Sequence, residues 1–186
     1  MDIQQLITGC IKKKPKAREK LYHTYKNTLF SISLKYCSSY AEAEDHLHDI
    51  FIEIFEKIHT YSGNGSFEGW MKRIAINKAI DRYKKKIRFE SLERSSSSTE
   101  PTIYVTDASY PISFNELMSC IHQLPPKYRI IFNLYELDDY SHKEIARMLS
   151  IATSTSKSNL HRAKVILKKQ ILNLTQEKSK NKRNGK

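Results

Sequence analysis

Apolar side chains recur along most of the chain at the three- and four-residue intervals of an amphipathic helix. The clearest run forms one broad stripe on a helix over residues 41–58, made of Leu47, Ile50, Phe51, Ile54, Phe55 and Ile58. Asp49 and Glu53 fall on other faces. Ser38 or Ser39 can cap this helix, and the acidic residues of its first turns suit the helix dipole. The segment is therefore predicted to be a helix with one buried face.

The same period predicts helices on both sides of this segment. A short helix over residues 2–11 precedes one over 16–40, whose apolar positions are Leu21, Tyr25, Leu29, Ile32 and Tyr36. The loop SGNGS (62–66) ends helix 41–58, because it holds two of the five glycines of the chain. Ser66 can cap the next helix, which carries Phe67, Trp70, Ile74, Ile80 and Tyr83.

Helical periods return after residue 111. One helix carries Phe114, Leu117, Met118, Ile121 and Leu124, and a second covers 127–137. Ser141 and Glu144 form a capping box in front of a helix over 142–149. The chain has only five Gly and five Pro, which argues against a turn-rich β fold. The sequence thus predicts an all-α fold.

Residues 87–111 interrupt these periods with a serine run, two prolines and mixed charges. This composition indicates a flexible linker, with a short strand over 103–106 as a minor alternative. We therefore expect two small helical domains, residues 1–88 and 112–175, joined by linker 89–111. The Lys- and Asn-rich residues 176–186 are expected to form a disordered basic tail.

The formal net charge of +12 indicates a polyanionic partner, either nucleic acid or an anionic membrane surface. The excess is uneven: residues 112–186 have 14 Lys and Arg against 6 Asp and Glu, and residues 1–111 have 18 against 14. The three cysteines fit neither a zinc motif nor a disulfide framework, as is typical of a reducing compartment. Without a leader pattern or a membrane-length apolar run, we expect a cytoplasmic protein with no metal or cofactor.

Residues 142–168 have the spacing of a helix-turn-helix: a helix over 142–149, a turn over 150–152 and a second helix from about Thr153. The second helix would bury Leu160, Ala163 and Leu167 and expose Thr155, Ser158, Asn159 and Arg162, flanked by Lys157, His161, Lys164 and Lys168. Small residues at its start allow close approach to a groove, and the cations favour phosphate. A solvated helix of a bundle is the alternative, but the charge of this half favours DNA binding.

These residues resemble a family. SHKEIARMLSIATSTSKSNLHRAKVILKK (141–169) is similar to the C-terminal helix-turn-helix of bacterial extracytoplasmic-function (ECF) sigma factors, whose T-x-K-S-x-L-x-R-A segment is matched at Thr155, Lys157, Ser158, Leu160, Arg162 and Ala163. LPPKYRIIFNL (124–134) resembles the stretch leading into that domain. Ser150 replaces the usual turn glycine, His48 an often found Gln, and Ser156 stands where many members have Val.

The first half resembles the same family independently. AEDHLHDIFIEIF (43–55) is similar to the helix that binds the polymerase clamp, and FEGWMKRIAINKAIDRYKK (67–85) to the promoter-melting helix. Trp70, Ile74, Ala75, Asn77, Asp81 and Arg82 fall on the family pattern. The resemblance covers nearly the whole chain, with the two regions in the family order. It implies a sigma region 2 bundle, a sigma region 4 helix-turn-helix and the function of a dissociable promoter-recognition subunit of RNA polymerase.

The resemblance also implies sites and partners. The upstream (minus thirty-five) element would be read as duplex DNA by Lys157, Ser158, Asn159, His161, Arg162, Lys164 and Lys168. The downstream (minus ten) element would be melted and held by Tyr61, Asn64, Phe67, Trp70, Lys72, Arg73, Asn77, Arg82, Lys84 and Lys85, although Phe67 and Trp70 could also be core residues. The polymerase core, at its beta-prime clamp, would contact Asp45, His48, Asp49 and Phe51. Family members are usually silenced by an anti-sigma factor, often membrane-anchored.

Three other classes of function are the alternatives. An enzyme is disfavoured because the seven histidines are scattered and no P-loop, GxSxG or GxGxxG motif is present, so no catalytic residue or small-molecule substrate is expected. A stand-alone helix-turn-helix regulator would bind duplex DNA without melting it. A general RNA-binding protein would show no preference for a duplex sequence.

Overall fold

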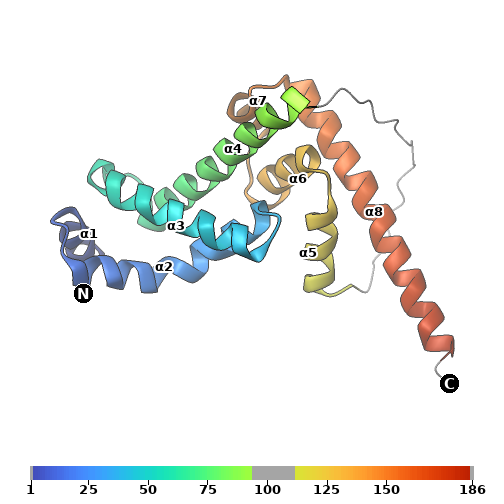
Figure 1. The fold of residues 1–186 in the computed structure, drawn as a ribbon, viewed down its shortest axis with the longest axis horizontal. Coiled ribbons are helices and arrows are strands. Elements are labelled where there is room, and N and C mark those ends of the chain that lie inside the picture. Colours follow the sequence, from blue (N-terminus) through green and yellow to red (C-terminus); the bar gives the residue numbers. More distant parts are fainter. Residues whose placement is uncertain (1, 94–111, 185–186) are drawn as a thin grey trace. The chain divides into compact units, whose positions relative to one another are not determined.

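The computed structural model describes residues 2–93 and 112–184, and every element in these ranges is a helix (Figure 1). The chain divides into two compact units, residues 1–86 and 87–186. The predicted all-α class with two helical units is confirmed. Most of the predicted linker lies outside the described residues, and so does the strand considered for 103–106.

The first unit contains α1 (Ile3–Ile11), α2 (Pro15–Tyr36), α3 (Tyr40–Lys57), the 3-10 turn η1 (Ile58–Thr60) and most of α4 (Phe67–Glu93). Two predicted serine caps form: Ser39 Oγ accepts from the amide of Glu42, and Ser66 Oγ from that of Gly69. Each cap satisfies an amide that the first helical turn leaves without a partner. The caps therefore fix where α3 and α4 begin.

The core of this unit is the apolar stripe of α3, as the periodicity predicts. Ile50 and Ile54 are fully buried, together with Leu21 and Leu29 of α2 and Met71 of α4. Burying such side chains gives each of them roughly 1.5–3 kcal/mol of favourable free energy. This packing holds α2, α3 and α4 together beneath the surfaces described below.

One polar pair lies within that core. Nδ1 of His46 is 3.0 Å from Oγ of Ser33, and neither side chain is exposed. Burial lowers the pKa of His46 to about 4, and the positive charges of Arg82 and Lys78 act in the same direction. The ring is therefore neutral near pH 7.

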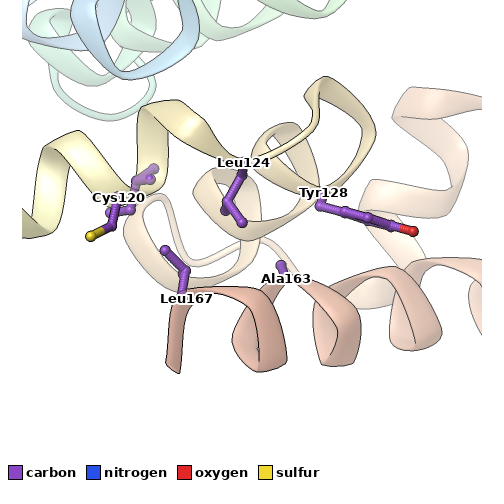
Figure 2. Close-up of a cluster of buried hydrophobic side chains, with 6 residues drawn as sticks. Cys120, Leu124, Tyr128, Ala163 and Leu167 are labelled. Atoms are coloured by element: carbon purple, nitrogen blue, oxygen red, sulfur yellow. The ribbon is translucent and has the colours of Figure 1, made fainter. Parts of the chain in front are cut away.

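The second unit contains α5 (Phe114–Gln123), α6 (Pro126–Phe132), the π-helical turn η2 (Asn133–Leu137), α7 (His142–Leu149) and α8 (Thr153–Asn184). Figure 2 shows the centre of this unit, where side chains from α5, from α6 and from the connection between them meet α8: Cys120, Leu124, Tyr128, Ala163 and Leu167. The predicted capping box at Ser141 and Glu144 forms at the start of α7. Helix α8 is thus the central helix against which the other helices of the unit pack.

Two helices extend further than the sequence predicts. Helix α4 continues to Glu93, into the expected linker, and residues 176–184 of the tail that was expected to be disordered belong to α8. Extending an existing helix needs no new nucleus. In addition, Nζ of Lys178 lies 2.7 Å from the carboxylate of Glu116 on α5, which ties the extension of α8 to the unit.

Candidate nucleic-acid and protein interfaces

The predicted helix-turn-helix forms between α7 and α8, with the connection at residues 150–152. Ser150 has φ of 58° and ψ of 45°, in the left-handed region that favours glycine. The amide of Ile151 donates to the carbonyl of Ala146, which closes the end of α7. The turn therefore keeps a glycine-like backbone conformation with serine in its place.

Helix α8 has the two faces that the sequence predicts. Leu160, Ala163 and Leu167 are buried. The residues predicted to contact the upstream element all reach the surface, either exposed (Lys157, Ser158, His161, Lys164) or half-buried (Asn159, Arg162, Lys168). One helix face thus presents small polar and cationic side chains together.

A polar contact that the sequence did not predict joins the two helices of this motif. Ser156 is fully buried, and its Oγ lies 2.9 Å from Nδ1 of His142 at the start of α7. The His142 ring stacks on Tyr135, with centroids 4.4 Å apart. Burial lowers the pKa of His142, and Lys157 and Lys164 act in the same direction. The neutral ring bridges α7 and the first turn of α8; a pair separated by 14 residues leaves no periodic signal in the sequence.

One of the predicted upstream contacts has a partner within its own unit. Nζ of Lys164 lies 2.7 Å from the carboxylate of Glu136 in η2. Both side chains are partly exposed, so the pair contributes little stability. A phosphate that approached this face would compete with Glu136 for the ammonium group.

The loop between η1 and α4 is closed by its first residue. The hydroxyl of Tyr61 donates to the carbonyl of Gly65 at 2.7 Å. Gly63 and Gly65 have φ of 80° and 83°, a conformation that side chains disfavour. Asn64 is exposed between them. The loop is thus a defined turn that presents Asn64 to solvent.

Three aromatic rings flank this loop and contact one another. Phe67 and Trp70 are stacked, with centroids 5.6 Å apart and an interplanar angle of 15°, and Tyr61 lies 5.1 Å from Phe67. Tyr61 and Trp70 are half-buried, so part of each ring is open to solvent. Phe67 is only 5% exposed, so the structure places it in the core rather than at the predicted DNA surface. The buried ring of Phe67 packs against the other two rings.

The polar residues predicted on α4 differ in their surroundings. Arg73, Asn77, Lys84 and Lys85 are exposed. Lys72 lies 2.6 Å from Glu68 one turn earlier. The guanidinium of Arg82 lies 3.8 Å from Glu42 and 3.9 Å from Asp49 on α3. The predicted DNA contact Arg82 and the predicted protein contact Asp49 therefore meet at one place.

The outer face of α3 carries the predicted protein contacts. Asp45, His48 and Asp49 are exposed on it, but Phe51 is only 4% exposed and packs on Tyr22, with ring centroids 4.7 Å apart. Phe51 was predicted both as part of the buried apolar stripe and as a contact of the polymerase. Its burial agrees with the first prediction and not with the second. Ile52, which was not among the predicted contacts, is 57% exposed one turn after His48. The sequence carried a signal for this residue, because an apolar side chain outside the buried stripe is expected to be exposed.

A metal centre and a membrane span have no candidate among the residues that the structure describes. No group of three or more His, Cys, Asp or Glu side chains that could hold a metal ion occurs in the described ranges. None of the helices described is both long enough and apolar enough to cross a membrane.

Both units match known families. Residues 21–89 match Sigma-70 region 2, and residues 114–167 match Sigma-70, region 4. Together with the aromatic loop and the helix-turn-helix, these matches indicate a protein of the sigma-70 type that contains regions 2 and 4.

Similar proteins of known family show to which family the chain belongs. ECF RNA polymerase sigma factor SigW of Bacillus subtilis (strain 168) is 33% identical over 161 residues, which are 81% of this chain and 86% of SigW. SigM of the same organism, also an ECF RNA polymerase sigma factor, is 24% identical over 151 residues, 81% of this chain and 92% of SigM. The chain belongs to the ECF RNA polymerase sigma factors, as the resemblance of its motifs predicts.

A solved structure shares the fold. The sigma factor RpoE, crystallised with the anti-sigma factor NepR from Bartonella quintana, superposes with a TM-score of 0.51 at 17% sequence identity. The match covers 82% of this chain and 94% of that chain.

Proposed function

We propose that this chain is a promoter-recognition subunit that binds core RNA polymerase and DNA in two states. The observation that carries the proposal is the presence of two unlike nucleic-acid surfaces in one chain, an aromatic loop and a helix-turn-helix. A stand-alone regulator has no use for the first surface. Membership of the ECF family supports the same function.

The upstream element is read as a duplex by α8. Arg162, Lys157, Ser158 and Asn159 contact base edges in the major groove, where each base pair presents a distinct pattern of donors and acceptors. His161, Lys164 and Lys168 contact phosphates, which position the helix without specifying sequence. The His142–Ser156 bond keeps α7 and α8 in the docking geometry.

The downstream element is held as a single strand by the first unit. An unstacked base needs a pocket with an aromatic wall, and the half-buried rings of Tyr61 and Trp70, beside the loop that carries Asn64, can supply that wall. Phe67 acts as support for these rings. Lys72, Arg73, Asn77, Arg82, Lys84 and Lys85 contact the strand backbone along α4.

The polymerase clamp binds the outer face of α3. Asp45, His48 and Asp49 supply polar contacts, and Ile52 supplies the apolar contact that was first assigned to Phe51. A face with exposed carboxylates suits a protein partner better than DNA. An anti-sigma factor, in keeping with the family, would silence the chain by covering these surfaces.

The chain contributes binding and positioning, and we expect it to have no catalytic activity of its own, because RNA synthesis is the chemistry of the polymerase. A protein that works with polymerase on promoters acts in the cytoplasm.

Run-off transcription with purified core polymerase tests the proposal. The chain should confer initiation at a defined promoter, with permanganate-reactive thymines in the downstream element marking melted DNA. If the chain bound duplex DNA but neither associated with core polymerase nor opened the promoter, a stand-alone regulator would be the better description. Sequence-independent binding to RNA alone would favour the RNA-binding alternative.

A further inference from the structure

The basic segment at the α1–α2 junction has no part in the function proposed above. Lys12, Lys14, Lys16 and Lys20 surround a hollow of about 590 Å³ on the first unit. Its walls come from one side of α1 and from the first turns of α2, which lie against each other in Figure 1. The hollow is therefore built by a helix pair inside one unit.

The charge around this hollow is not neutralised by the protein. None of the four lysines forms an ion pair in the part of the chain that the structure describes, whereas Lys57, Lys72 and Lys78 of the same unit each lie within 3.1 Å of a glutamate. Like charges one helical turn apart, such as those of Lys16 and Lys20, repel. Four unpaired ammonium groups around one hollow favour a ligand with several negative charges.

The remaining walls are neutral. A Cβ added to Gly9 would lie 2.7 Å from Cβ of Ala17, so α1 and α2 meet there through a backbone and a methyl group. Gln4, Gln5 and Thr8 line the side formed by α1 with amide and hydroxyl groups. The hollow thus combines a smooth apolar floor, neutral hydrogen-bonding groups and a cationic rim. A nucleotide has matching parts: a base and sugar with polar edges, and charged phosphates.

We propose that this hollow binds the phosphates of a nucleotide, carried either by a single DNA strand or by a free nucleoside polyphosphate. The lysines neutralise the phosphates, and the positive end of the α2 dipole adds to their field. Helix α1 packs against η1, which leads directly into the loop over 62–66. The loop and the hollow belong to the same unit. Binding of a DNA strand at this hollow rests on the proposed function, whereas binding of a free nucleotide does not.

Salt-dependent binding of the full chain tests this site. The probe is a short fluorescein-labelled oligothymidine, titrated by anisotropy at several salt concentrations. Changing Lys12, Lys14, Lys16 and Lys20 to Gln should reduce the slope of log affinity against log salt by up to about 3, since each phosphate contact on a single strand contributes about 0.7. The fold should persist, because the change removes only repelling charges.

Two further variants separate a site from general charge. In the matched control, Lys127, Lys143, Arg147 and Lys169 of the second unit become Gln, which removes the same formal charge. Thr8→Trp fills the hollow and keeps the charge, and it should weaken strand binding as the four-lysine change does. Equal losses in the four-lysine variant and the matched control, or unchanged binding by Thr8→Trp, would overturn the proposal.

Competition with a nucleoside triphosphate distinguishes the two sources. Loss of strand affinity in the variants without displacement by the triphosphate identifies a DNA strand, and loss of triphosphate binding alone identifies a free nucleotide. Variants that bind both probes normally but bind core polymerase poorly would show a protein-docking surface and overturn the proposal. Run-off transcription with the unchanged chain reports separately on the promoter function, so either idea can fail alone.

Discussion

The two units build their proposed DNA surfaces in opposite ways. In the second unit all seven proposed contacts project from α8, whose other face is buried against the rest of the unit. In the first unit the proposed contacts come from a loop and from α4, and stacked rings support the loop. A rigid helix with small and cationic side chains fits the groove of a duplex, whereas a loop flanked by aromatic rings fits an unstacked base. The difference indicates that one chain handles paired and melted DNA with separate devices.

The largest expected effect concerns the ring that supports the loop. Phe67→Ala removes a buried ring between Tyr61 and Trp70 and should lower the free energy of unfolding of the first unit by about 3–5 kcal/mol. Trp70 is the single tryptophan of the chain, so its fluorescence during urea unfolding reports on this unit. Tyr40→Ala is the control, because Tyr40 is an aromatic residue of the same unit that is 63% exposed. Unchanged stability together with lost promoter opening would instead make Phe67 a DNA contact.

The error over Phe67, and the similar one over Phe51, shows what the sequence could and could not predict. Periodicity places residues around a helix axis, which is why the stripe of α3 and the buried face of α8 were predicted. Capping chemistry is local, which is why the starts of α3, α4 and α7 were predicted. Whether an aromatic residue next to a loop is covered depends on neighbouring elements, here Tyr25, whose ring centroid lies 6.0 Å from that of Phe67.

The contact between His142 and Ser156 was unpredictable for a related reason. Each residue is unremarkable on its own helix, and only the turn at Ser150, with φ of 58°, brings the two side chains together. The pairing of Arg82 with Glu42 and Asp49 likewise depends on how α4 lies against α3. Sequence patterns define single helices well, and contacts between helices follow only from their packing.

Acid should destabilise the first unit through His46. The unfolded imidazole has a pKa of 6.5, whereas burial lowers the pKa of the folded group to about 4. The unfolded state therefore binds a proton first as the pH falls below 6.5. Stability that is fully present at pH 7 should decline between pH 6.5 and 4, by ~3 kcal/mol at most. Urea unfolding followed by Trp70 fluorescence at several pH values measures this decline.

A variant without the titrating group completes the test. His46→Gln keeps a hydrogen-bonding group near Ser33 but cannot titrate, so the unfolding free energy of this variant should change less between pH 7 and 5. His142, whose pKa is also lowered by burial, lies in the second unit and does not affect the Trp70 signal directly. An equally steep decline in the variant would show that other groups, such as Glu53, dominate the acid response.

A pair of substitutions tests whether the two DNA surfaces work separately. Arg162→Ala should weaken binding to upstream duplex by roughly 5- to 100-fold, the value of one good base contact, and leave polymerase binding unchanged. Trp70→Ala should weaken binding to a downstream single strand by a similar factor, the value of one stacked base, and leave duplex binding unchanged. Fluorescence anisotropy with the two DNA probes measures both effects. If either substitution affected both probes equally, the division between paired and melted DNA would be wrong.

The smallest expected effect lies at the edge of the helix-turn-helix. Glu136 holds Lys164 in an ion pair of 2.7 Å, so Glu136→Gln should free the ammonium group for a phosphate and tighten duplex binding about two- to threefold. Glu177→Gln is the matched control, because it removes the same charge from an exposed position on α8. If both variants tightened binding equally, the gain would come from net charge. If only Glu136→Gln tightened binding, and the gain disappeared when Lys164→Gln was added to it, then Glu136 restrains this phosphate contact directly.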